Sequence, residues 1–184
     1  MNLPNLLTSL RLVLVPVFVV LFEAGNPARA GLAAAVFAVA VATDWLDGYA
    51  ARRSGQTTRI GKLLDPIADK ILIAAALVIL VDAGRVASWL AVLLIGRDFV
   101  VTGLRFVAAT GGQIIAADAG GKVKMGVQTG ACLLLIGSDA VVGFPAETIG
   151  TLGLWASLVL SYYSAVRYVR QYGAARVQQG GSRS

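Results

Sequence analysis

The chain has 184 residues, of which 57% are hydrophobic and only 14% are charged, and its mean hydropathy is +0.75. A soluble domain of this length rarely needs so much apolar surface, so the composition predicts an integral membrane protein of one domain. The net charge of +6 does not indicate nucleic-acid binding, because the cations stand at the ends of apolar runs, where they suit anionic lipid headgroups. Histidine is absent and Cys132 is the only cysteine, which excludes an intrachain disulfide and leaves carboxylates, lysines and tyrosines as candidate general bases.

Apolar runs predict three helices in the first half of the chain. The first covers residues 6–22, and we interpret it as a retained spanning helix rather than a signal peptide, because it has no basic leader and no small-x-small cleavage site. The second runs from about residue 30 to residue 52. The third continues to residue 81, and Pro66 near its start either kinks it or marks its first turn.

Three further helices are predicted in the second half, at residues 86–109, 125–138 and 148–166. The chain is therefore predicted to be an all-α, polytopic membrane protein with six transmembrane helices, which form one catalytic domain over residues 1–172. Residues 173–184 are polar, glycine-rich and basic, and we expect a flexible cytoplasmic tail. Only the sixth run offers nearly 20 uncharged residues in a row, so a packed soluble helical protein is the alternative.

The basic residues are distributed unevenly among the predicted loops. The N-terminal segment, the second–third loop, the fourth–fifth loop and the tail carry nearly all of them, whereas the opposite loops carry only Arg29 and Arg85. Because cytoplasmic loops of membrane proteins are enriched in lysine and arginine, this bias predicts that both termini face the cytoplasm.

Four of the ten acidic residues lie between residues 44 and 69. On a helix, Asp44 and Asp47 share one face, and Asp65 and Asp69 share another. The polar segment 52–58 between them predicts a turn that places the two helix ends side by side. The carboxylates would then repel one another unless a cation lies among them.

The residue types at this cluster point to hard cations. Oxygen ligands without histidine favour Mg²⁺, Mn²⁺ or Ca²⁺ over zinc. Four carboxylates can hold two divalent ions, and such a pair suits a diphosphate, because it stabilises both the attacked phosphorus and the leaving oxygen. The alternative is structural: the aspartates cap helix ends or pair with neighbouring Arg52, Arg53, Arg59 and Lys70.

The spacing of this segment resembles the signature of the CDP-alcohol phosphatidyltransferases, Asp44-x2-Asp47-Gly48-x2-Ala51-Arg52-x8-Gly61-x3-Asp65-x3-Asp69. The resemblance implies a six-helix homodimer that displaces CMP from a CDP-linked lipid with an alcohol, using two Mg²⁺ or Mn²⁺ ions. It implies that the metal ligands are Asp44, Asp47, Asp65 and Asp69, and that Asp69 is also the base that takes the proton of the attacking hydroxyl. The nucleotide would be bound by Asp44, Asp47, Gly48, Ala51 and Arg52, together with Asn5 and Thr8. The alternative for Asn5 and Thr8 is that they only cap the first helix.

Four outer segments resemble the bacterial phosphatidylglycerophosphate synthases, which use CDP-diacylglycerol and glycerol 3-phosphate: NLPNLLTSLRLVLVPVFV, LDPIADKILIAAAL, GRDFVVTGLRFVAATG and GGKVKMGVQ. The likeness implies a bacterial cell (inner) membrane location with a cytoplasmic active site. This branch usually has glutamate where Asp98 stands and threonine where Met125 stands. Phosphatidylglycerol and inositol phosphate are therefore alternative acceptors, and a small metal or proton transporter is the alternative outside the family.

The acceptor phosphate is expected to bind Arg97, Arg105, Lys122 and Lys124. Charge within an apolar helix is costly and usually functional, and arginine can bind phosphate through two hydrogen bonds. Asp98 shares a helix face with Arg105 and is expected either to pair with it or to orient it. Gly126 and Gly130 form a GxxxG pattern that predicts close helix packing.

Overall fold

The computed structural model describes residues 3–54, 59–110 and 119–181, and the side chains of residues 9–43, 67–104, 106 and 123–167. The described part of the chain forms six α-helices and a short 3-10 helix: α1 (Leu3–Leu21), α2 (Pro27–Ser54), α3 (Arg59–Asp82), α4 (Ser88–Thr110), α5 (Ala119–Ile136), η1 (Ser138–Ala140) and α6 (Ala146–Gly181). The predicted all-α class and the number of helices are therefore confirmed. By length and composition, one helix among the described residues, Ala146–Arg167, is suited to cross a membrane.

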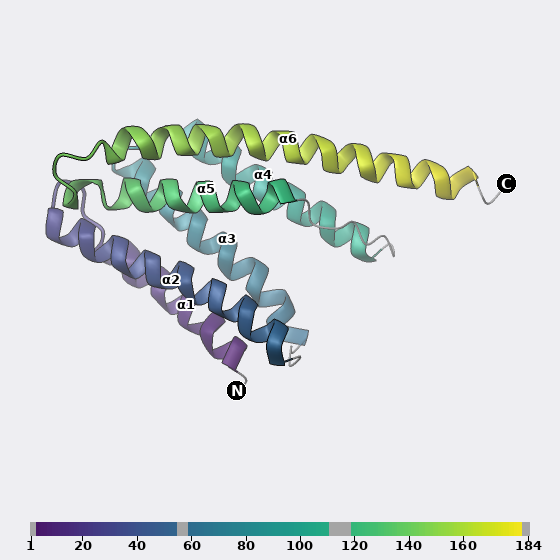
Figure 1. Cartoon of the computed structure of the whole chain (residues 1–184), viewed down its shortest axis with the longest axis horizontal. Helices are drawn as coiled ribbons and strands as arrows, with labels where there is room; N and C mark the ends of the chain where they lie inside the picture. The colour runs from purple at the N-terminus through teal and green to yellow at the C-terminus, as the bar shows by residue number, and fades with distance from the viewer. Residues whose placement is uncertain (1–2, 55–58, 111–118, 182–184) are drawn as a thin grey trace.

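Successive helices run in opposite directions, so the bundle has two distinct ends (Figure 1). The starts of α1, α3 and α5 lie at the same end as the ends of α2, α4 and α6, and we call this the terminal end, because both chain termini lie there. The α1–α2, α3–α4 and α5–α6 connections lie at the opposite end, which we call the distal end. The terminal end is thus the end to which the sequence assigned nearly all the basic residues.

The distal turns follow from local sequence. Asn26 caps α2, because its side-chain oxygen accepts a hydrogen bond from the backbone N–H of Arg29 at 3.3 Å, and Pro27 occupies the first helical position, where proline is favoured. Gly25 and Gly84 have positive φ angles of 81° and 72°. Only glycine adopts that conformation readily, so these two residues allow the sharp turns after α1 and α3.

The core lies between two closely packed helix pairs, α1 with α2 and α5 with α6, and α3 is packed against α1. Phe18 of α1 and Phe37 of α2 are fully buried and form an edge-to-face pair with 5.6 Å between ring centroids. On α6, Gly150 and Gly153 allow the close approach of α5, because an added Cβ would lie 2.6 Å from Leu135 Cγ and 2.9 Å from Ala131 Cβ respectively.

Several boundaries differ from the sequence-based expectations. The fifth helix begins at Ala119 rather than near residue 125, so Lys122 and Lys124 belong to α5 and not to the preceding loop. The third begins at Arg59, which places Pro66 inside the helix and not in its first turn. Helix α6 continues to Gly181, beyond the expected end at residue 166 and into the expected tail. The tail's flexibility stays a prediction.

The prediction drawn from the GxxxG pattern on α5 was wrong for the bundle. A Cβ added at Gly126 or Gly130 would meet no atom within 4 Å, whereas Gly150 and Gly153 of α6 are the glycines in close contact. The pattern on α5 therefore leaves open space beside the helix instead of a helix–helix contact.

A partly buried arginine links the connections at the distal end. Arg85 donates hydrogen bonds to the Asp139 carboxylate and, at 2.7 Å, to the carbonyl oxygen of Leu135, and its guanidinium lies 5.6 Å from the ring centroid of Phe22. Asp139 also accepts a 2.8 Å hydrogen bond from the backbone N–H of Gly25. We call Arg85, Asp139 and Gly25 the distal clasp, since they join all three distal connections.

Candidate functional site

The acidic residues singled out from the sequence lie on the two helix ends that flank residues 55–58 at the terminal end (Figure 1). Asp44 lies ten residues before the end of α2 and Asp69 ten residues after the start of α3, which is about 15 Å along each helix. Asp47 and Asp65 lie seven and six residues from the same ends. Because the two helices are antiparallel and joined by a short connection, Asp44 lies at about the same distance from the terminal end as Asp69, and Asp47 at about the same distance as Asp65.

The side chains of three of these acids, Asp44, Asp47 and Asp65, lie outside the described residues, and that of Asp69 is half-buried. Helix α1 packs against both α2 and α3. The cation Arg11 on α1 is fully buried and lies eight residues, about 12 Å, from the start of its helix. A buried positive charge is thus present at a distance from the terminal end similar to that of the acidic residues.

The donor set fits a hard divalent cation. All four candidate ligands are carboxylates, and the only thiol of the chain, Cys132, is fully buried in the core, where burial makes it unsuitable as a ligand. Among the side chains that the structure describes, no three His, Cys, Asp or Glu residues could hold a metal ion together. The described part of the bundle therefore offers no competing centre.

The remaining residues predicted for the nucleotide and the acceptor lie on helices that reach the terminal end. Their backbone positions are described, and their side chains are not: Asn5 and Thr8 on α1, Gly48, Ala51 and Arg52 on α2, Arg105 on α4 and Lys122 on α5. The side chains of Arg97 and Lys124, by contrast, are described in full, and they meet at one carboxylate.

That carboxylate belongs to Asp98. Lys124 Nζ lies 2.5 Å from Asp98 Oδ1 and 2.7 Å from Oδ2, and Arg97 Nη1 lies 3.1 Å from Oδ1. Arg97 Nε also donates to the carbonyl oxygen of Ser161 on α6 at 2.9 Å. The three charged side chains are at most 13% exposed, so the structure holds two cations and one anion in a largely buried cluster that joins α4, α5 and α6.

Among the described side chains, the partners of Asp98 are Arg97 and Lys124, which the sequence analysis had assigned to the acceptor phosphate and not to Asp98. The expected pairing of Asp98 with Arg105 stays a prediction, because the side chain of Arg105 lies outside the described residues. Lys124 comes from another helix, and helical spacing predicts contacts only along one helix.

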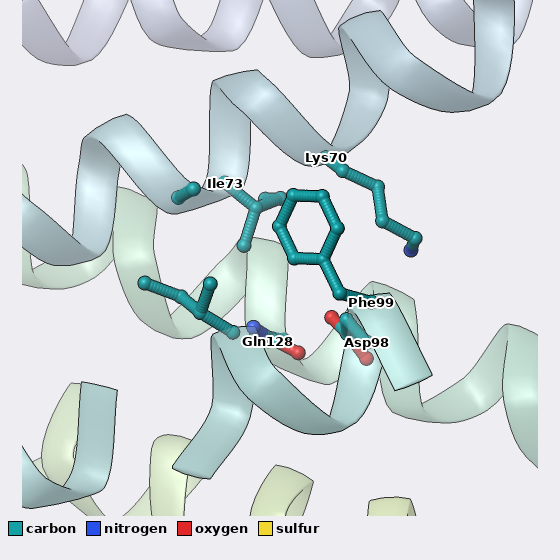
Figure 2. Close-up of a pocket in the computed structure, with 7 residues that line it drawn as sticks. Lys70, Ile73, Asp98, Phe99 and Gln128 are labelled. Carbon is teal, nitrogen blue, oxygen red and sulfur yellow. The ribbon is translucent and has the colours of Figure 1, made fainter. Parts of the chain in front are cut away.

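Next to this cluster lies a small cavity that the sequence did not reveal (Figure 2). Its volume is about 10 Å³, roughly the space of one water molecule. It is lined by residues of α3, α4 and α5: Lys70, Ile73, Ala74, Ile95, Asp98, Phe99 and Gln128. Gln128 lies one helical turn from Lys124, and this spacing is the only sign of it that the sequence contains.

A second, larger space opens between α2 and α5. It is an apolar groove of about 360 Å³ lined by Phe37, Ala38, Val41, Ala42, Thr129, Gly130 and Leu133. Val41 lies three residues, less than one helical turn, before Asp44, so the groove runs up to the acidic end of α2. Gly130 contributes to its width, because it adds no side chain.

Comparison with known proteins identifies the family of the chain. The family model described as CDP-alcohol phosphatidyltransferase matches residues 1–163. The chain is similar to the CDP-diacylglycerol–glycerol-3-phosphate 3-phosphatidyltransferase of Bacillus subtilis (strain 168), with 38% identity over 179 residues that cover 91% of this chain and 93% of that protein. The protein of the same name from Pectobacterium atrosepticum is 36% identical over 91% of this chain and 93% of its own length.

A third relative, named probable phosphatidylglycerophosphate synthase, comes from Mycobacterium tuberculosis (strain ATCC 25618 / H37Rv) and is 40% identical over 91% of this chain and 80% of its own. The family match spans most of the chain, including both acidic helix ends and the cluster around Asp98. The chain therefore belongs to the CDP-alcohol phosphatidyltransferase family and is a transferase.

Proposed function

We propose that the protein transfers the phosphatidyl group of CDP-diacylglycerol to glycerol 3-phosphate, which gives phosphatidylglycerol phosphate and CMP. The observation that carries the proposal is the family's acidic spacing on the two helix ends at the terminal end, with a buried cation cluster on the neighbouring helices. The relatives named for this reaction support the choice of acceptor.

The carboxylates of Asp44, Asp47, Asp65 and Asp69 would hold two divalent cations, Mg²⁺ or Mn²⁺. When bound, the pair neutralises the diphosphate of the lipid nucleotide and stabilises the leaving phosphate oxygen. Gly48, Ala51 and Arg52 on α2, with Asn5 and Thr8 on α1, bind the cytidine nucleotide, because small residues let it approach the helix and Arg52 can pair with its phosphates.

Membrane embedding is supported by the outer surface of the bundle. Every one of the six helices carries an apolar side chain that is more than half exposed: Val13 and Val20, Leu32 and Val39, Val78, Val92 and Phe99, Val123, and Leu152 and Val159. Such surface on all sides suits lipid and not water. The protein spans the bacterial inner membrane six times, with the basic terminal end and the active site on the cytoplasmic side, and it acts as a homodimer.

The lipid substrate enters from the side. The groove between α2 and α5 is lined almost wholly by apolar groups, and its lining residue Val41 lies three residues before Asp44 on α2, so one acyl chain of CDP-diacylglycerol lies in it while the diphosphate reaches the acidic residues. The remaining acyl carbon atoms stay in the bilayer, which avoids the cost of drawing them into water.

The acceptor approaches from the cytoplasm toward the cation cluster. Arg97 and Lys124 carry two positive charges against the single negative charge of Asp98, so the cluster attracts an anion. With Arg105 and Lys122, they bind the phosphate of glycerol 3-phosphate. Asp69 takes the proton of the primary hydroxyl, whose oxygen attacks the lipid-side phosphorus, and the bond from that phosphorus to the CMP oxygen breaks.

The decisive experiment supplies purified protein with CDP-diacylglycerol and one acceptor at a time, and measures CMP release. We expect release with glycerol 3-phosphate and much less with phosphatidylglycerol or inositol phosphate. Preference for either of the other acceptors would contradict the proposed substrate and keep the reaction class. Cation flux in liposomes without any CMP release would contradict the reaction class as well.

The role of Asp69 is tested by Asp69→Asn. We expect turnover to fall by at least about 100-fold, because the amide cannot accept the proton, while CDP-diacylglycerol binding stays within a few-fold of the original. Asp82→Asn is the matched control, since Asp82 is an exposed residue at the distal end of the same helix. Activity of Asp69→Asn close to that of the control would refute the assignment of the base.

A further inference from the structure

The side chain of Gln128 is buried and incompletely hydrogen-bonded. It is 2% exposed, and its Oε1 accepts a 3.2 Å hydrogen bond from Ser157 Oγ on α6. Its Nε2 has no hydrogen-bond partner within the described part of the chain. Because buried amide donors are normally hydrogen-bonded, we expect a further group beside Nε2 that can accept this hydrogen bond.

The cavity that Gln128 lines limits what this group can be. Its volume of about 10 Å³ holds one water-sized group and is too small for a phosphate. Figure 2 shows Lys70 and Ile73 of α3 on one side of the cavity and Asp98 and Gln128 on the other. A hydroxyl group fits both the size and the polarity of this space.

The hydrogen-bonding capacity of Asp98 makes a hydroxyl a better match than a group that only accepts. Asp98 Oδ1 already lies within hydrogen-bonding distance of Arg97 and Lys124, whereas Lys124 is the one donor to Oδ2 among the described side chains. A carboxylate oxygen has two lone pairs, so Oδ2 can accept one more hydrogen bond. A hydroxyl can donate to Asp98 and accept from Gln128 Nε2 at the same time.

The position of the cavity relates this hydroxyl to the acceptor. Lys70 directly follows the proposed base, Asp69, and Gln128 lies one helical turn from Lys124, a proposed phosphate ligand. Glycerol 3-phosphate carries a secondary hydroxyl between its phosphate and its reacting primary hydroxyl. A molecule held at one end by the cations on α4 and α5 and at the other by Asp69 on α3 would span the space between these helices, whose residues line the cavity.

We infer that Gln128 and Asp98 form a subsite for the secondary hydroxyl of the acceptor, and that Gln128 is a specificity-determining residue. Gln128 donates from Nε2 to that hydroxyl, and Ser157 orients the amide by binding its oxygen. The inference rests on the proposed function, since it assigns one more contact to the same acceptor.

The test compares glycerol 3-phosphate with 3-hydroxypropyl phosphate, which keeps the phosphate and the primary hydroxyl and lacks the secondary one. The measured quantity is the ratio of kcat/KM for the two acceptors, from CMP release. Gln128→Met preserves much of the side-chain shape and removes the amide. We expect it to lower the wild-type ratio about ten-fold, through loss of activity with glycerol 3-phosphate only, because a hydroxyl-binding site discriminates against the analogue that lacks the group.

Ser164→Ala, which truncates another buried polar residue of α6 away from the cavity, serves as the matched control and should leave the ratio unchanged. Continued turnover of 3-hydroxypropyl phosphate by Gln128→Met shows that the variant is folded. If that variant does not fold, Gln128→Leu must give the same fall in the ratio.

An unchanged ratio in the folded variant, or an equal loss with both acceptors, would overturn the inference, since the cavity would then hold only water or serve packing. Failure of the wild-type protein to release CMP with either acceptor is a different result. It would refute the proposed function itself, and the subsite with it.

Discussion

Asp98 shows how a single carboxylate makes charge tolerable inside an apolar bundle. Two cations in a largely buried position are costly unless a counter-charge is close, and here Lys124 and Arg97 share one. The carbonyl oxygen of Ser161 satisfies a further guanidinium donor. The shared carboxylate also leaves the cluster with one net positive charge, which is what recognition of an anionic acceptor requires.

Replacing Asp98 tests whether its carboxylate stabilises the two neighbouring cations. Asp98→Asn keeps the shape of the side chain and removes the charge, so two buried cations lose their counter-charge, and the free energy of unfolding should fall by about 3–5 kcal/mol. Asp98→Glu should cost less, because the charge remains. The measurement is denaturant or thermal unfolding in detergent, with exposed Asp82→Asn as the control. Equal midpoints for Asp98→Asn and the control would show that the cluster adds nothing to stability.

At the scale of the helices, two glycine pairs have different surroundings: Gly150 and Gly153 of α6, three residues apart, and Gly126 and Gly130 of α5, four residues apart. Gly150 and Gly153 of α6 let α5 approach, whereas Gly126 and Gly130 of α5 face open space. Spacing alone cannot distinguish the two cases, because it says that a smooth helix face exists and not which neighbour covers it. Gly130 instead widens the groove assigned to the lipid substrate.

Gly130→Leu should therefore obstruct the groove. We expect the KM for CDP-diacylglycerol to rise about five-fold or more, with a smaller change in kcat, since a branched side chain would occupy space needed by an acyl chain. Gly126→Leu is the matched control, because Gly126 lies one turn away on the same helix and does not line the groove. The measurement is CMP release against lipid concentration in mixed micelles. Identical KM values for the two variants would remove the groove from the lipid path.

The sequence predicted the helices better than it predicted their ends. Apolar runs located all six helices, because each run is longer than a typical strand. The runs did not reveal that α5 starts at Ala119 or that α6 continues to Gly181, since polar residues with good helix propensity extend a helix beyond its apolar part. Spacing likewise identified the acids on α2 and α3, but contacts between helices, such as Lys124 with Asp98, require the tertiary packing.

At the scale of the whole molecule, the candidate functional site and the distal clasp lie at opposite ends of the bundle. The terminal end carries the acids and the cations, and the distal end carries the clasp of Arg85, Asp139 and Gly25. Arg85 and Asp139 are 54 residues apart in sequence, and Gly25 and Asp139 are 114 apart, which explains why no local pattern revealed the clasp. The sequence did predict which connections share an end, through the distribution of lysine and arginine.

The clasp makes stability depend on acidic pH. Burial alone would raise the pKa of Asp139, but the hydrogen bonds from Arg85 and the Gly25 N–H, with the Arg85 charge, outweigh it and lower the pKa below its ordinary 3.8. The stabilisation is therefore complete well above pH 3.8 and is lost as the pH falls through the lowered value. We expect Asp139→Asn to lower the free energy of unfolding by about 1–3 kcal/mol at neutral pH, because Arg85 loses its partner.

Unfolding of the wild type and of Asp139→Asn in detergent, followed from neutral pH down to about pH 3, checks this expectation. The difference between the two proteins should be constant near neutral pH and shrink in strong acid. A difference that stays the same across the whole range would show that the carboxylate charge is not what the clasp uses.

The distal clasp also sets how the bundle can move. Because it binds the α1–α2, α3–α4 and α5–α6 connections to one another, a tilt of one helix pair against another would pivot near Arg85. For rigid helices, the displacement produced by a tilt grows with distance from the pivot. A small rotation at the distal end would therefore displace the helices most at the terminal end, where it would change the width of the groove between α2 and α5 near Val41 and Ala42.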